Sequence, residues 1–95
     1  MTEDTVRARK AEAFFAHGEA KERFNTCLST ARVLGKGLRS LGALLETDPT
    51  NIDAEANRDL MDFDRLEGAV SDVLKAQTEL NSAVSAAQAL GCVVT

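Results

Sequence analysis

The sequence predicts an all-α protein that folds as one long antiparallel helical hairpin. Apolar residues recur at alternating spacings of four and three on both sides of the chain's midpoint, which is the pattern of long packed helices. The only proline of the 95 residues, Pro49, stands near that midpoint. The composition is rich in alanine and leucine and contains no Trp or Tyr, which favours helix over sheet. We expect a single domain over residues 1–95.

The first predicted helix covers about residues 5–46. Its seam, the row of positions that a second helix would cover, is apolar except at Lys10 and His17. Phe14, Leu28 and Leu44 widen the apolar stripe, so more than one neighbouring helix is expected. The full set of seam positions is Val6, Lys10, Ala13, His17, Ala20, Phe24, Cys27, Ala31, Leu34, Leu38, Leu41 and Leu45.

Glycines inside this helix leave an alternative open. Each costs up to about 1 kcal/mol relative to alanine, and Gly35 and Gly37 are close enough together to break or kink a helix. A break would allow a compact three-helix monomer. The preferred interpretation is a continuous helix in which Gly35 and Gly42, seven residues apart, let a neighbouring backbone approach.

A tight turn is predicted at about residues 47–50. Proline disfavours helical geometry in the residue before it, and Asp followed by Pro is a favoured helix start. Asp48 is therefore the expected cap of the second helix, with Thr50 or Asn51 as alternatives. A connection this short makes the flanking helices antiparallel neighbours, with residue i facing about 97 − i.

The second predicted helix covers about residues 51–90. One row of its seam is Ala56, Phe63, Val70, Gln77 and Val84, and the other is Leu66, Val73, Leu80 and Ala87, with Leu60 and Leu74 broadening the face. Gly91 stands where a left-handed C-terminal cap is expected, with Cys92 and Val93 available to fold back.

Two helices alone would leave much of these seams exposed, so the sequence favours self-association. A dimeric four-helix bundle is the first expectation, and a larger ring of hairpins is the second. The residues expected in the core or oligomer seam are Phe24, Leu34, Leu38, Leu41, Phe63, Leu66, Val70, Val73 and Leu80. His17 and Gln77 are expected to form a polar layer in this core, either as a pair that fixes the register or as a pH-sensitive layer.

The sequence contains no credible enzymatic or metal-binding pattern. There is one histidine, with no Glu-x-x-His pattern. Cys27 lies almost three turns, about 15 Å, from His17 along one helix, which is too far for proton transfer. No catalytic residue, metal or cofactor is therefore expected. Short apolar runs, an acidic N-terminal end and two cysteines expected to be reduced favour a cytoplasmic location without membrane association.

Charge divides unevenly between the halves. Residues up to Glu46 include eight basic and six acidic residues, whereas those after it include three and nine. The preferred interpretation is pairing within the hairpin, with Arg32, Lys36 and Arg39 opposite the acidic region around residues 58–65. The acidic face could otherwise dock on a basic partner or imitate nucleic acid. The positions proposed to contact a partner are Phe15, Asp59, Asp62 and Glu67.

Two functional hypotheses follow. The first is a non-enzymatic oligomeric adaptor or regulator that binds another protein through helix surfaces. The second is a nucleic-acid-associated assembly factor, such as a DNA-packaging adaptor or an RNA-binding hairpin, with a basic rim near the N-terminus. The candidate nucleic-acid contacts are Arg7, Arg9, Lys10, Lys21 and Arg23.

Overall fold

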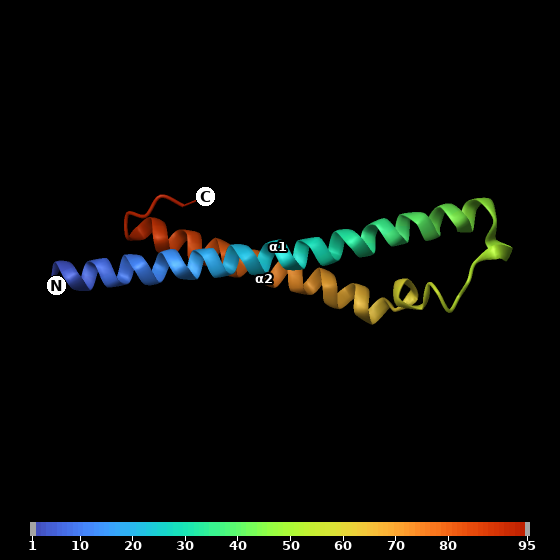
Figure 1. Cartoon of the computed structure of the whole chain (residues 1–95), viewed down its shortest axis with the longest axis horizontal. Helices are drawn as coiled ribbons and strands as arrows, with labels where there is room; N and C mark the ends of the chain where they lie inside the picture. The colour runs from blue at the N-terminus through green and yellow to red at the C-terminus, as the bar shows by residue number, and fades with distance from the viewer. Residues whose placement is uncertain (1, 95) are drawn as a thin grey trace. The chain divides into compact units, whose positions relative to one another are not determined.

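The computed structural model describes residues 2–94 and confirms the all-α hairpin (Figure 1). The α-helix α1 spans Glu3–Thr47 and the α-helix α2 spans Phe63–Ala89. Two short 3-10 helices, Pro49–Asn51 and Arg58–Met61, lie in the connection between them. No β-strand occurs in the part of the chain that the structure describes.

The first helix is continuous, as expected, but the expected close approach at Gly35 and Gly42 is wrong, because nothing lies within 4 Å of a Cβ added at either position. The helix runs through Gly35 and Gly37 without a break. A Cβ atom added at Gly37 would lie 2.8 Å from Cδ2 of Leu60, so the connection packs its leucine against bare backbone at this point. The helix ends where the Asp48 amide donates to the Leu44 carbonyl at 2.8 Å, because Pro49 has no amide hydrogen to continue the series.

The second helix begins at Phe63, so the predicted start near residue 51 is wrong. Asp48 does not cap α2. Its carboxylate accepts hydrogen bonds from the Thr50 hydroxyl at 3.1 Å and from the side-chain amide of Asn51 at 2.8 Å, beside a single 3-10 turn. The predicted turn is thus the first part of a longer irregular connection.

Short polar side chains explain why this connection is not helical. The Asp53 carboxylate accepts hydrogen bonds from the amides of Glu55 at 3.0 Å and Ala56 at 3.1 Å, and the Asn57 side chain donates to the Asp53 carbonyl. Such local bonds compete with the bonds of a helix. The true N-cap of α2 is Asp62, whose carboxylate accepts from the Arg65 amide at 3.1 Å.

The C-terminal end of α2 confirms the predicted glycine cap. Gly91 has a φ of 83°, in the left-handed region. Its amide donates to the Gln88 carbonyl at 3.0 Å, and the Cys92 amide donates to the Ala87 carbonyl at 2.9 Å. This pair of bonds is the Schellman motif, which satisfies carbonyls that the last helical turn leaves unpaired.

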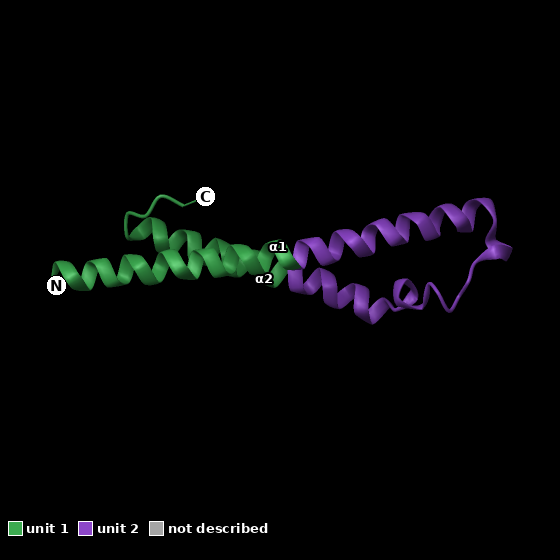
Figure 2. Ribbon diagram, in the orientation of Figure 1, with its two compact units in different colours: residues 1–26, 74–95 green, residues 27–73 purple. Residues whose placement is uncertain are grey.

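The contacts divide the chain into two compact units (Figure 2). Unit 1 comprises the chain up to Thr26 together with the chain from Leu74 onward. Unit 2 comprises Cys27–Val73 and includes the whole connection. Each unit therefore pairs a part of α1 with a part of α2.

The core of unit 1 is built from small side chains. Ala20, Ala76 and Ala87 are buried, and Ala87 has no exposed surface. Two larger side chains of this unit, His17 and Val94, are also buried. Alanine seams allow two helix backbones to approach closely.

The register of unit 1 differs from the expected one. The thiol of Cys92 lies 3.9 Å from the Lys10 carbonyl, and Arg23 lies 3.6 Å from Glu79. In both pairs the two residue numbers add up to 102, whereas the expected register gives about 97. The register differs because the longer connection makes α2 begin at a later residue. His17 is thereby placed opposite the region of Ser85 rather than Gln77.

The core of unit 2 is built from leucines. Leu34 and Leu41 of α1 are buried, Leu60 and Leu66 are half-buried, and Leu38 is 37% exposed. Within this unit α1 and α2 diverge toward the connection (Figure 2). The leucine seam therefore has incomplete cover within one chain.

Candidate interaction surface

The α2 helix has three apolar rows, and of the two that were predicted to face α1, one is covered and the other is largely exposed. The row Leu66, Val73, Leu80 and Ala87 is buried or half-buried, as expected. The second covered row consists of Ala69, Ala76, Ala83 and Leu90, whereas Phe63 and Val70 are 80% and 57% exposed. This alanine row was absent from the predicted seam, which took the row of Phe63 and Val70 in its place. Alanines spaced every seven residues were the available signal.

The predicted polar layer of His17 and Gln77 is not present within the chain. His17 is 8% exposed, whereas Gln77 is exposed. The shifted register accounts for this correction, because it moves Gln77 away from the position opposite His17. Gln77 belongs to the same outward row of α2 as Phe63 and Val70.

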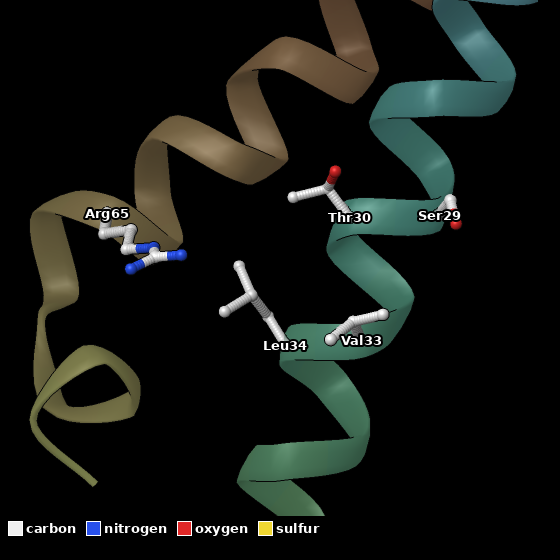
Figure 3. Close-up of a pocket in the computed structure, with 5 residues that line it drawn as sticks. All are labelled: Ser29, Thr30, Val33, Leu34 and Arg65. Carbon is white, nitrogen blue, oxygen red and sulfur yellow. The ribbon is translucent and has the colours of Figure 1, made fainter. Parts of the chain in front are cut away.

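A small open hollow lies between α1 and the first turns of α2 in unit 2 (Figure 3). Its volume is about 220 Å³, and it is lined by Ser29, Thr30, Val33, Leu34 and Arg65. Thr30 and Leu34 extend toward α2, and Arg65 extends toward α1 (Figure 3). The Arg65 guanidinium is engaged by the Asp59 carboxylate at 3.0 Å. The lining contains no carboxylate, imidazole or thiol that could serve as a general base.

The described part of the chain offers neither a cluster of metal ligands nor a helix that could span a membrane. Among residues 2–94, no three His, Cys, Asp or Glu side chains are grouped so that they could hold a metal ion. Over the same residues, neither helix has an apolar stretch long enough to cross a bilayer. The absence of enzymatic activity stays a prediction.

The N-terminal basic cluster lies on α1 in unit 1, with every member exposed. Two of its five members are engaged by acidic side chains. Arg7 lies 3.3 Å from Glu3, and Arg23 pairs with Glu79. Among residues 2–94, the side chains of Arg9, Lys10 and Lys21 form no ion pair.

A second basic group occupies unit 2 and is called the basic stripe here: Arg32, Lys36 and Arg39. Spacings of four and three place these exposed residues along one face of α1. The predicted pairing of this stripe with the acidic region around residues 58–65 is wrong, because no ion pair within residues 2–94 involves Arg32, Lys36 or Arg39. Arg32 is two residues, about 200°, from the seam position Leu34, so it lies on a different face of α1.

The candidate partner contacts have different environments. Phe15 is 72% exposed on α1 in unit 1, and Glu67 is exposed on α2 in unit 2. Asp59 is bound to Arg65, and Asp62 caps α2. Phe24, in the seam of α1, is half-buried.

Glu67 lies between two exposed apolar residues of the same helix face. Phe63 precedes it by four residues and Val70 follows it by three, so the three side chains are neighbours on the surface of α2. Asp64 precedes Glu67 by three residues and extends the same patch. These four residues, Phe63, Asp64, Glu67 and Val70, are called the α2 outer patch below.

Known proteins give no direction for interpreting these surfaces. No protein-family model, curated protein sequence or solved structure matches this chain. The function of these surfaces is therefore inferred from the chemistry of the basic stripe, the α2 outer patch and the unevenly covered seams.

Proposed function

We propose that this protein is a non-enzymatic interaction protein that self-associates and acts as an adaptor or regulator, binding another protein through its helix surfaces. One observation carries the proposal: Phe63 and Val70 stand exposed in a row on α2. Full burial of a large apolar side chain contributes about 1.5–3 kcal/mol. Two such side chains in one patch are a substantial driving force for association.

The incomplete cover of unit 2 supports the same proposal. Val33, Leu44 and Leu45 of α1 are exposed there, along with Met61 in the connection. Exposed apolar residues scattered singly need no explanation, but a concentration of them is typical of interaction sites. Among residues 2–94, seven of the eleven exposed large apolar side chains lie in unit 2, which directs the proposal to that unit.

The test replaces the exposed apolar row and measures mass in solution. Wild-type protein at tens of micromolar should form a defined oligomer by light scattering. The variant F63Q/V70Q should raise the dissociation constant at least tenfold, since both changes remove apolar contact while glutamine still favours helix. The control F15Q changes an equally exposed phenylalanine in unit 1 and should leave the oligomer intact. A wild-type monomer at these concentrations would contradict the self-association.

A nucleic-acid-associated assembly factor is the second candidate, favoured by the unengaged Arg9, Lys10 and Lys21. The five basic residues of that cluster would then form the rim that meets phosphates. Binding to mixed DNA and RNA at low and moderate salt tests this candidate, because phosphate contacts weaken steeply as salt rises. Absence of salt-dependent binding at micromolar protein would remove it. The cytoplasmic location and the imitation of nucleic acid by the acidic face stay predictions.

A further inference from the structure

Two exposed surfaces of unit 2 have complementary chemistry. The basic stripe carries three positive charges, and Val33, which is 67% exposed, lies next to Arg32 and one turn before Lys36. A shallow hollow of about 510 Å³ lies among Ser29, Arg32, Val33, Gly35, Lys36 and Arg39. All of its lining comes from α1, so it is the space between side chains of one helix rather than a cleft closed by another element.

The α2 outer patch has the opposite charge and the same length along its helix. Asp64 and Glu67 carry its two negative charges, while Phe63 and Val70 supply the apolar contact. The patch spans seven residue steps along α2, about 10 Å, and the stripe from Arg32 to Arg39 spans the same length along α1. A helix bearing the patch can therefore lie along a helix bearing the stripe with both acidic side chains of the patch facing basic ones, which leaves one positive charge of the stripe unopposed.

Neither surface satisfies its charge within the chain. Of the basic and acidic side chains in unit 2, only Arg65 and Asp59 form an ion pair among residues 2–94. Asp62 is also engaged locally, because its carboxylate caps α2. The stripe and the patch are thus both available to a second molecule.

We infer that the basic stripe of one copy docks onto the α2 outer patch of a second copy of this chain. The inference rests on the proposed function and identifies the self-association surface within it. A second copy is the occupant because the missing chemistry, an acidic and apolar helix face of matching length, is present on the chain itself. Exposed ion pairs add little free energy, so Phe63, Val70 and Val33 supply the attraction and the charges fix which faces meet.

A charge swap tests this docking directly. The variant R32E/K36E/R39E places acid against acid, and the variant D64K/E67K places base against base. Each alone should self-associate at least tenfold more weakly than the wild type. An equimolar mixture should assemble to within about threefold of wild-type affinity, because the reversed stripe of one variant then meets the reversed patch of the other.

Two controls separate a specific contact from a change in net charge. R9E/K10E/K21E changes the charge as much as the reversed stripe does, and E12K/E19K changes it as much as the reversed patch does. All five positions are exposed in unit 1 and have no ion pair within residues 2–94. Both controls should keep wild-type affinity in analytical ultracentrifugation.

The outcomes distinguish the docking from the proposed function. If the wild type assembles and the mixture of swapped variants does not recover, the docking is wrong while self-association stands. If the wild type is monomeric, both are wrong. Should D64K/E67K lose helicity by circular dichroism, the milder pair K36E and E67K replaces it, and failure of that mixture to recover overturns the docking. Displacement of the oligomer by mixed RNA at moderate salt would assign the stripe to nucleic acid instead.

Discussion

Units 1 and 2 bury the same kind of helical seam with side chains of different size. Unit 1 uses alanines, with Ala87 completely buried and Ala20 and Ala76 nearly so. Unit 2 uses leucines, of which Leu34 and Leu41 are buried while Leu38 remains at the surface. Small side chains allow close helix contact but bury little apolar area per residue. Large ones bury more, but only where enough surface faces them.

This difference separates two tasks along one pair of helices. The alanine seam of unit 1 is covered within the chain. The leucine seam of unit 2 extends past the start of α2, and its remaining apolar surface, together with the α2 outer patch, is available to another molecule. The two seams should therefore respond to opposite changes. Enlarging a buried side chain should destabilise unit 1, and truncating a buried side chain should destabilise unit 2.

Truncation in unit 2 should have the largest effect. L41A removes most of a buried leucine side chain and should lower the free energy of unfolding by about 2–4 kcal/mol, through lost burial and the cavity left behind. The measurement is urea denaturation followed by circular dichroism. The matched control is L45A, four residues later on the same seam but 56% exposed, which should cost less than about 1 kcal/mol in the monomer. Equal losses for the two variants would show that unit 2 has no effective core.

Enlargement in unit 1 should have the next largest effect. A87L inserts a larger side chain where alanine is completely buried, and overpacking of this kind costs about 1–3 kcal/mol. The neighbouring control A86L makes the same change at an exposed position and should be nearly neutral. Thermal melts of the two variants provide the measurement. A neutral A87L would mean that the alanine seam is loosely packed, contrary to the comparison.

The sequence was sufficient to predict the fold class, the continuous first helix and the buried seam residues of α1 in both units. Heptad spacing and the Gly91 cap carry strong local signals, so Ala20, Leu34 and Leu41 were placed correctly. The start of α2 was not, because Asp53, Asn57 and Asp62 make side-chain bonds to backbone that an apolar pattern does not reveal.

That error explains why the wrong row of α2 was predicted to face α1. A connection longer than the proline turn changes the register, and register decides which row of α2 faces α1. Phe63 and Val70 were therefore wrongly predicted to face α1 within the chain. Their burial in an oligomer stays a prediction. The pairing of the basic stripe with Asp59 failed for a separate reason, since the stripe lies on a different face of α1 from the seam and Asp59 binds Arg65.

Two glycines in unit 2 provide the smallest and sharpest test of how this region packs. G35A adds a methyl group where nothing lies within 4 Å, so it should stabilise the monomer by up to about 1 kcal/mol through higher helix propensity. G37A gains the same propensity, but its Cβ would meet Leu60 at 2.8 Å. Because the contacting atoms are at the flexible end of the leucine, G37A should be less stabilising than G35A by a few tenths of a kcal/mol or more. In an L60A background, G37A should raise the free energy of unfolding, relative to L60A alone, by the full amount expected from helix propensity. Denaturation of the two variants provides the measurement. Identical behaviour of G35A and G37A in the wild-type background would show that Leu60 does not rest on α1 in solution.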